Sequence, residues 1–488
     1  MNKIIVLFLI IIISGTGLFA APANPAPQTI SYPDGRELTV YLRGDENRSW
    51  YETLDGFHLM RNNEDVFEYT IVSDQGKIMT SGVRANDPFG RDAEELAFTE
   101  TLTKNISYSA RMTYVDGPSF QKTSGTSASD YTFDKTNFPT LGENKFLVIL
   151  VDFTNRSFVH NTTDFDSLMN ADNYTYNSAY GSVRQYYKDS SFDLFDPRFD
   201  IVGPVTADSN YAYYGGNDMA NIQRFVYEAV TKADSLVDYS LYDNNGNGYV
   251  DNIYIIHAGY GACFSGADPN TIWPHRWSYH ASTLIVDGKR IWDYSTSMEL
   301  HGTSGTNRTN IGVIAHEFGH VLGLPDYYDT DYEGSGGNCG GLGSWDLMAG
   351  GSWNDNGRRP PLMNAWSRMY LRWADPLELT DTEQVTMQPA HTHNEIRYFH
   401  SQTTGEFFMM ENRQRSAWDA AIPGHGLLIF HVDMNHSGWN NNTLNCNPYK
   451  QGFDLEEADG LGNISASYIN AGDPFPGSSG DTKFNDTG

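Results

Sequence analysis

The chain has 488 residues, of which 39% are hydrophobic and 19% are charged. Its 32 Lys and Arg against 61 Asp and Glu leave a formal net charge of −29. This balance argues against a nucleic-acid-binding protein, because such proteins need a basic surface to meet phosphates. The length and the apolar share allow two or three domains with cores of their own and exclude a disordered chain.

The N-terminus has the layout of a secretory signal peptide. One Lys precedes an unbroken apolar run from Ile4 to Ile13, and small residues follow up to Ala23. The run is far shorter than the roughly 20 residues that span a bilayer. We assign residues 1–20 to a signal peptide, cut after about Ala20 or Ala23, and expect a secreted protein with no transmembrane segment.

The region that follows favours short strands. Residues 21–115 form a small β-rich unit, with strands expected at Leu38–Leu42 and Val66–Val72 between Gly-containing turns. Residues 116–140 are rich in Ser, Thr, Gly and Asp and indicate an exposed connector that is open to proteolysis.

Residues 141–375 have the pattern of an α/β domain. The continuous apolar run at Phe146–Asp152 predicts a strand covered on both faces. Helices are expected at about 179–189 and 220–236, and another strand at Ile253–Ile256. Residues 376–488 return to strands, and we expect the natural chain to continue beyond them.

Two histidines on one predicted helix form the strongest chemical signal. Within residues 311–326, apolar side chains recur at helical spacing and predict an amphipathic helix. His316 and His320 are four residues apart, so their imidazoles lie about 5–6 Å apart, within reach of one tetrahedral zinc ion. Glu317 is close enough to address a metal-bound water without binding the metal.

The end of this helix predicts the third ligand. Gly323 can end a helix with positive φ, and Pro325 cannot continue it. The sharp turn could bring Asp326 back to the metal. A surface helix with two stray histidines is the alternative, which the apolar stripe, the glycine stop and the acidic residue together disfavour.

Residues 316–326 and the following Tyr-Tyr-Asp resemble the zinc signature of the immune inhibitor A family of secreted bacterial metzincin proteases, which implies a bacterial source. Most metzincins end this motif in His, whereas that family and this chain end it in Asp. The resemblance extends over most of residues 145–435. The further matching segments are Gly181–Tyr187, Ile272–Trp277, Gly343–Met348, Phe407–Arg413 and Gly426–Asp433.

The resemblance implies a fold, an activity and a set of ligands. It implies a metzincin-like α/β catalytic domain with a mixed sheet and an active-site helix, between a β-rich propeptide and a β-rich C-terminal subdomain. Met348 matches the methionine turn beneath the zinc, although an ordinary core methionine is the alternative. The expected activity is that of a zinc endopeptidase acting on proteins or peptides, in which zinc polarises the scissile carbonyl and activates a water, and Glu317 is the general base. We expect a monomer.

A second metal signal lies in an Asp- and Asn-rich loop. The spacing of its oxygen-bearing residues resembles the first part of a calcium loop, but Tyr254 replaces the glutamate that ends an EF-hand. A polar turn without metal is the alternative. The candidate ligands are Asp243, Asn245, Asn247, Tyr249 and Asp251.

The remaining candidates have weaker signals. We expect His257 and His275 to be structural, since the zinc helix already supplies a complete ligand set. Glu411 and Asp433 lie in apolar strands and suit a polar network or calcium. Tyr327, Tyr328 and Arg276 are possible stabilisers of the oxyanion.

The cysteines restrict both cross-linking and latency. Cys263, Cys339 and Cys446 are too few for a disulfide scaffold, although one bridge is allowed. No cysteine precedes residue 263, so a propeptide thiolate cannot cap the zinc, and a carboxylate or steric cover is the remaining option. Two other functions compete with a zinc endopeptidase: an inactive calcium-dependent adhesion or binding protein, and a zinc hydrolase of non-peptide bonds.

Overall fold

The computed structural model describes most of the chain from Ala21 onward. The described residues are 21–32, 35–45, 49–62, 66–72, 78–102, 104, 120–122, 131–133, 138–216, 219–332, 336–380, 384–462 and 469–484. The predicted signal peptide lies outside them. Among the described residues, no helix has the length and the apolar character needed to cross a bilayer.

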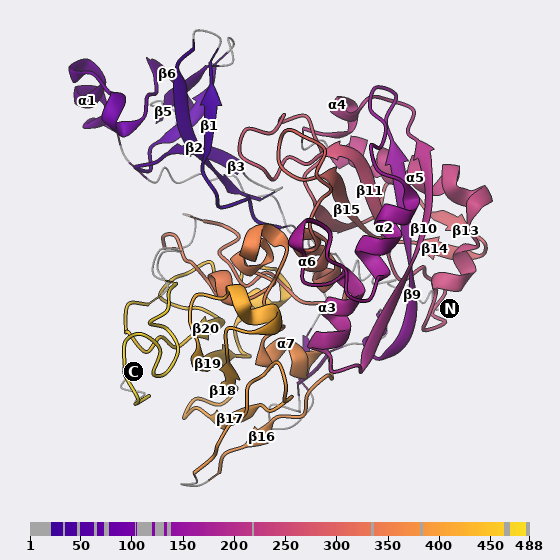
Figure 1. Cartoon of the computed structure of the whole chain (residues 1–488), viewed down its shortest axis with the longest axis vertical. Coiled ribbons are helices and arrows are strands. Elements are labelled where there is room, and N and C mark those ends of the chain that lie inside the picture. Colours follow the sequence, from indigo (N-terminus) through magenta and orange to yellow (C-terminus); the bar gives the residue numbers. More distant parts are fainter. Residues whose placement is uncertain are drawn as a thin grey trace, which may run out of the picture.

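The N-terminal unit is a six-stranded antiparallel sheet in which each strand pairs with the next along the chain. In Figure 1 it forms a separate indigo lobe. Alternate residues of β2 point into its core, because successive strand side chains face opposite sides. The elements are β1 Gln28–Ser31, β2 Glu37–Gly44, β3 Ser49–Thr53, β4 His58–Arg61, β5 Phe67–Val72, β6 Ile78–Arg84 and α1 Ala93–Thr99.

The predicted connector contains one short piece of regular structure. Strands β7 Phe120–Lys122 and β8 Tyr131–Phe133 pair antiparallel. The composition of residues 116–140 favours turns and gives no sign of this pair.

The central sheet has the order β10-β9-β11-β15-β12. Its first four strands are parallel, and the edge strand β12 runs antiparallel to β15. The sheet is therefore mixed, as predicted. The strands are β9 Gly142–Asp152, β10 Phe195–Thr206, β11 Ile253–Tyr260, β12 His275–Ser278 and β15 Asp293–Leu300.

Helices cover both faces of this sheet (Figure 1). Phe146, Val148 and Leu150 of β9 pack in one cluster with α2, α3 and α6, whereas the intervening Leu147 and Ile149 pack with α5 on the other side. This arrangement explains why β9 is a continuous apolar run. The helices are α2 Thr162–Asn170, α3 Val183–Ser190, α4 Tyr211–Tyr214, α5 Met219–Ala233, α6 Ile311–Val321 and α7 Ala365–Tyr370.

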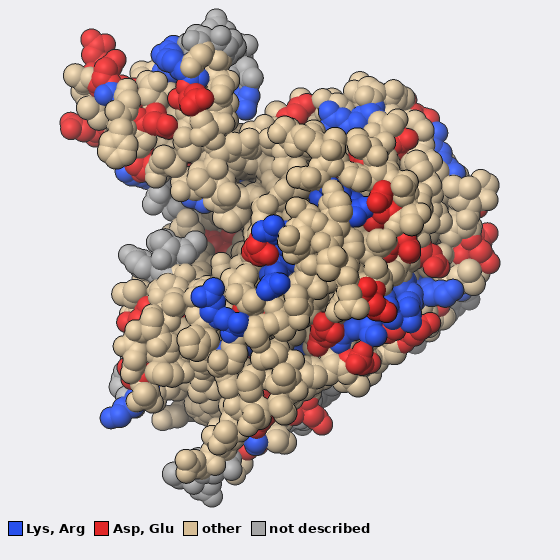
Figure 2. Space-filling view, viewed as in Figure 1, with Lys and Arg blue, Asp and Glu red and all other residues tan. Residues whose placement is uncertain are grey.

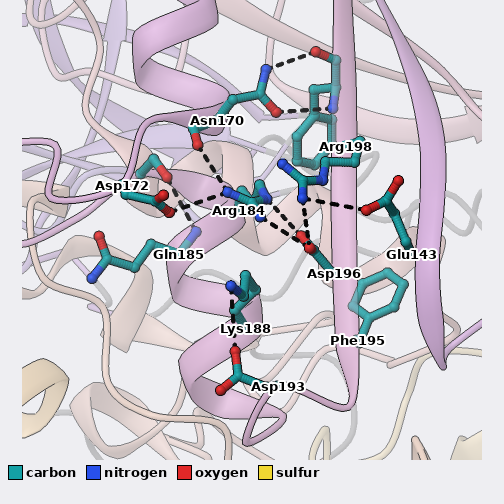
Figure 3. Close-up of polar contacts among 12 residues, drawn as sticks. Glu143, Asn170, Asp172, Arg184, Gln185, Lys188, Asp193, Phe195, Asp196 and Arg198 are labelled. Carbon is teal, nitrogen blue, oxygen red and sulfur yellow. Dashed lines mark hydrogen bonds and ion pairs between the residues drawn. The ribbon is translucent and has the colours of Figure 1, made fainter.

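Arg184 fixes α3 against the sheet. Its guanidinium bonds both carboxylate oxygens of Asp196 on β10, at 2.5 and 2.9 Å, and also reaches Asp172 (Figure 3). From the same helix, the Tyr187 hydroxyl donates to the carbonyl of Ala315 on α6 at 2.5 Å. The network therefore helps to hold α6 in place.

The C-terminal part is a second sheet that shares the core of the first. Trp366 of α7 and Phe407 and Leu428 of the second sheet belong to the same buried cluster as α6. The sheet has the order β16-β17-β18-β19-β20. The strands are β16 Leu377–Glu378, β17 Arg397–His400, β18 Glu406–Arg413, β19 Gly426–Asp433 and β20 Phe453–Leu455.

Short elements complete the described structure. A small hairpin pairs β13 Leu284–Val286 with β14 Lys289–Ile291. The 3-10 turns are η1 Pro88–Gly90, η3 Tyr176–Ser178, η4 Asp234–Leu236, η5 Tyr239–Tyr242, η6 Gly343–Trp345, η7 Gly350–Gly357, η8 Ala417–Ala421 and η9 Ser437–Asn440.

All three cysteines are buried free thiols. The single disulfide that the sequence allowed is therefore not formed. On the face in Figure 2, acidic and basic side chains lie interspersed over α1 and over the α2, α3 and β10 region, and no continuous basic patch gathers there.

Candidate active site and metal centre

The helix α6 carries the two predicted zinc ligands. It begins after Asn310 and runs to Val321, and Gly323 follows with φ +97°, as its stop signal predicted. One expectation was wrong: the helix is not amphipathic in its setting, because all eleven residues are buried. The N-terminal unit, β15 and η7 cover the face that the pattern left for solvent, so a surface helix with stray histidines is excluded.

Backbone carbonyls orient both imidazoles. Nδ1 of His316 lies 2.8 Å from the carbonyl of Leu347, and Nδ1 of His320 lies 2.7 Å from that of Leu324. A carbonyl only accepts, so each Nδ1 carries a proton, and each Nε2 is the nitrogen that can bind a metal when it is unprotonated. Both histidines are therefore oriented to bind a metal through Nε2.

Three acceptor atoms converge at one point. The Nε2 atoms of His316 and His320 are 3.0 Å apart, and Oδ1 of Asp326 lies 3.3 Å from each of them. All three residues are buried, and they form a group able to hold one ion. The turn after Gly323 thus brings Asp326 back to the histidines.

This triangle fits a zinc ion. Ligands at 2.0–2.1 Å in a tetrahedron are separated by about 3.3 Å, close to the three distances found. Two imidazole lone pairs and a carboxylate repel one another unless a positive charge lies between them. The donor set of two nitrogens and one oxygen is also one that zinc accepts while keeping a fourth position open.

The pKa values of His316, His320 and Asp326 reflect the need for a positive charge between them. Burial alone lowers the pKa of His316, but the hydrogen bond and the charge of Asp326 raise it to about 8. Burial lowers the pKa of His320. Burial alone raises the pKa of Asp326, but the two imidazoles hold it at about 2. The carboxylate therefore stays ionised and attracts one cation to the site.

Two segments beyond the motif support the ligands. Asn442 donates through Nδ2 to Oδ2 of Asp326 at 2.7 Å and accepts from the Asp326 backbone N–H at 2.8 Å. Met348 is buried and follows Leu347, which bonds His316. A Cβ on Gly319 would come within 2.5 Å of the Met348 sulfur, so the methionine lies directly against the ligand helix.

Glu317 lies beside the three ligands and is fully buried. Burial raises the pKa of its carboxyl to about 8. Its Oε1 accepts the backbone N–H of Ala21 at 2.7 Å, and its Oε2 makes no hydrogen bond with a described residue. One oxygen is thus held by the N-terminal segment, whereas the other remains available for proton transfer.

Residues 21–24 are held against the site by hydrogen bonds. The indole N–H of Trp273 donates to the carbonyl of Ala21 at 3.0 Å, and that of Trp353 donates to the carbonyl of Pro22 at 2.9 Å. The backbone N–H of Asn24 donates to the carbonyl of Cys263 at 2.8 Å. The segment therefore occupies space next to Glu317.

The possible oxyanion stabilisers are engaged elsewhere. The hydroxyl of Tyr327 lies 3.0 Å from Oγ of Ser367, and the Arg276 guanidinium pairs with Asp293. Tyr328 is buried in the core around α6. None of these contacts directs the three side chains toward the histidine pair.

The other histidines and the strand carboxylates have structural contacts. His275 bonds the carbonyl of Trp273 and the hydroxyl of Tyr294, and His257 is buried against Phe153. Glu411 binds Arg368 and Arg413 in a fully buried network, as predicted. Asp433, by contrast, caps the backbone of Asn435 and lies outside this network.

The Asp- and Asn-rich loop folds into consecutive polar turns. Oδ1 of Asp243 accepts the N–H of Asn247, Asn245 accepts that same N–H, and the side chain of Asn247 accepts the N–H of Tyr249. The ammonium of Lys289 lies 2.6 Å from Oδ2 of Asp243. These contacts match the alternative of a polar turn without metal.

One atom of the loop still favours a cation. Asp251 is buried, and its Oδ1 has no hydrogen-bond partner among the described residues. Burial raises the pKa of Asp251 to about 7. Calcium binding by this loop therefore stays a prediction.

Sequence reasoning missed the residues that reach the site from far along the chain. Asn442 is 116 residues beyond Asp326, and Ala21 is 296 residues before Glu317. Neither lies in a motif that marks it as part of a metal site. The only sequence signal near Ala21 was that of signal-peptide cleavage.

Comparisons with known proteins agree with this geometry. Residues 135–374 match the family model for the catalytic domain of immune inhibitor A peptidase M6. The pre-pro-metalloprotease PrtV of Vibrio cholerae serotype O1 is 32% identical over 244 residues, covering 41% of this chain and 25% of the relative. Immune inhibitor A of Bacillus thuringiensis subsp. alesti is 28% identical over 265 residues, covering 43% of this chain and 36% of the relative.

The matched region thus spans about a quarter to a third of the length of these relatives. Residues 135–374, which match the family model, contain the histidine pair, Glu317, Asp326 and Met348. The predicted resemblance is confirmed, and the chain belongs to the immune inhibitor A peptidase M6 family of metalloproteases.

Proposed function

We propose that the protein is a secreted zinc-dependent endopeptidase that hydrolyses peptide bonds of proteins. The convergence of His316 Nε2, His320 Nε2 and Asp326 Oδ1 within 3.0–3.3 Å is the observation that carries this proposal. Family membership supports the metalloprotease activity. The mixed sheet, the buried ligand helix and the methionine turn support a metzincin-type catalytic domain at residues 141–375, with residues 376–488 as its β-rich C-terminal part.

Zinc at this site would act as a Lewis acid toward the scissile carbonyl and would lower the pKa of a water in its open position. Glu317 has the two properties of the proton carrier. It is adjacent to a candidate ligand, and its Oε2 makes no hydrogen bond with a described residue, so that this oxygen can accept the proton of a water and release it again. Its proton then goes to the leaving amine of the cleaved bond.

The N-terminal unit has the contacts of a propeptide that keeps the enzyme latent. The Ala21 N–H donates a hydrogen bond to Oε1 of Glu317, and the unit contacts loops around the site. Leu42 N–H donates to Ser265 Oγ at 2.9 Å, and Gln28 reaches Thr303 at 3.1 Å. With residues 1–20 removed as a signal peptide, the nitrogen on Glu317 would be the terminal amine of the chain. The proposed cause of latency is thus steric cover of the site, and not a cysteine or a carboxylate that binds the zinc.

A paired zinc and protease assay tests this function. The wild type should hold one zinc per chain and degrade casein after processing. Glu317→Gln keeps the shape and the zinc but should lose proteolysis by orders of magnitude. Glu143→Gln, an exposed change on β9, is the matched control and should keep full activity.

The same assay separates the competing functions. A chain that binds calcium but no zinc would be an adhesion or binding protein on a protease fold. A zinc-loaded chain that leaves casein and peptides intact would be a hydrolase of other bonds. Full proteolysis by Glu317→Gln would contradict the proposed role of this residue.

A further inference from the structure

The N-terminal segment occupies the position that the fragment with the new amino terminus would occupy just after the proposed cleavage. Glu317 passes its proton to the leaving amine, which is the nitrogen of the residue directly after the cleaved bond. In the structure the nitrogen 2.7 Å from Glu317 belongs to Ala21. Ala21 therefore occupies the place of that residue, and Pro22, Ala23 and Asn24 follow the path of the released fragment.

The two alanine side chains of this segment are buried. Ala21 and Ala23 are 0% and 8% exposed, whereas Pro22 between them is half-buried. Both alanine side chains thus enter the protein and are enclosed there.

A buried cluster surrounds the two alanines. Apart from Leu42 of the N-terminal unit, its fully buried members come from the catalytic domain and remain after the propeptide is removed. They are Cys263, Phe264, Ala267, Trp273, Met298 and Val313, with Trp353.

The side chains of this cluster are tightly packed and have little space into which they could move. Met298 of β15 is 0% exposed, and a Cβ on Gly261 would already come within 3.1 Å of its sulfur. Trp273 is 4% exposed, and Val313 lies on α6, all of whose residues are buried. Extra methylene groups in such a packed site force strained side chains or backbone shifts.

We propose that the subsite next to Glu317 selects small side chains, those of Gly, Ala and Ser, directly after the cleaved bond, and that Met298 is a specificity-determining residue of this subsite. The inference rests on the proposed endopeptidase function. It names the substrate class as proteins cut before small residues.

Peptide hydrolysis by the processed enzyme is the first test. A series of fluorogenic peptides differs only in the residue after the cut bond: Gly, Ala, Ser, Leu, Phe or Arg. We expect kcat/KM to fall about tenfold or more from Ala to Leu or Phe. Met298→Ala should raise kcat/KM for the Leu peptide and so reduce the preference for Ala over Leu. Met409→Ala, in the core of β18, should lower kcat/KM for both peptides alike. Equal or higher kcat/KM for Leu and Phe would overturn the proposal.

A second test needs no catalysis and uses the full chain. Ala21→Ser should keep residues 21–24 docked, whereas Ala21→Leu should release them, seen as faster hydrogen exchange in this segment. Ala21→Leu with Met298→Ala should restore slow exchange, and Ala26→Leu at an exposed position is the control. Exchange as slow in Ala21→Leu as in the wild type would overturn the subsite. If no peptide is cut, the proposed function fails, but this exchange experiment still decides the subsite.

Discussion

Asn442 and Asp326 exchange two hydrogen bonds across 116 residues of sequence. The Asn442 amide donates to one carboxylate oxygen at 2.7 Å, and its own oxygen accepts the Asp326 N–H at 2.8 Å. The other carboxylate oxygen, Oδ1, faces the two histidines. Asn442 thus fixes which oxygen Asp326 presents to the metal.

Removing this support should weaken zinc binding. In Asn442→Ala the carboxylate loses its orienting partner, and partners of this kind are worth about 10–100-fold in metal affinity. Competition with a chromophoric chelator measures that affinity. Asn441→Ala, next to it on the chain, is the control. Unchanged zinc affinity in Asn442→Ala would show that the turn after Gly323 positions Asp326 by itself.

Gly319 should tolerate no side chain while Met348 is present. A Cβ there would lie 2.5 Å from the methionine sulfur, so Gly319→Ala should lower the free energy of unfolding by about 1–3 kcal/mol, less the gain in helix propensity. Adding Met348→Ala makes room for the methyl group. In chemical denaturation the double variant should therefore lose less than the sum of the single changes. If the losses in the free energy of unfolding simply add, the new methyl group at position 319 does not clash with Met348.

His257 should make folding sensitive to acid. Burial lowers its pKa in the folded state to about 4, against about 6.5 in the unfolded chain. Between these values the unfolded state binds the extra proton, so the stability that the neutral histidine contributes is complete above pH 6.5 and is lost as the pH falls toward 4. The total loss is about 3 kcal/mol.

The comparison with His257→Gln isolates this effect, because buried carboxyl groups titrate in the same pH range. The free energy of unfolding of the wild type relative to the variant should decline from pH 7 to pH 4. A constant difference over this range would place His257 in contact with solvent or with an acidic partner.

Calcium should stabilise the loop that contains Asp243 and Asp251. The buried Oδ1 of Asp251 has no hydrogen-bond partner among the described residues, and a bound cation would satisfy it. Calcium should therefore raise the melting temperature of the wild type and leave that of Asp251→Asn nearly unchanged. A wild-type melting temperature that is insensitive to calcium and to a calcium-selective chelator would mean that the loop binds no calcium, and that Lys289 pairs with Asp243 in its place.

The parts predicted well from sequence are those that a short segment determines by itself. The spacing of His316 and His320 and the stop at Gly323 placed three candidate ligands together, because helix geometry and one turn set all their distances. The apolar run of β9 likewise indicated a strand covered on both faces. In each case the information lies within about a dozen residues.

The parts that the sequence did not reveal depend on packing between distant segments. The buried setting of α6 arises because the N-terminal unit and η7 cover it, and periodicity within the helix contains no trace of them. The contact of Ala21 with Glu317 depends on how a whole unit docks. Backbone amides and carbonyls also make several of these contacts, and they leave no residue-specific signal.

The most direct test of the metal centre is anomalous X-ray diffraction at the zinc absorption edge on crystals of the purified protein. A single strong peak is expected about 2.0–2.1 Å from Nε2 of His316, Nε2 of His320 and Oδ1 of Asp326. A zinc-loaded crystal with its peak elsewhere, and with the three side chains bonded only to one another, would contradict the account.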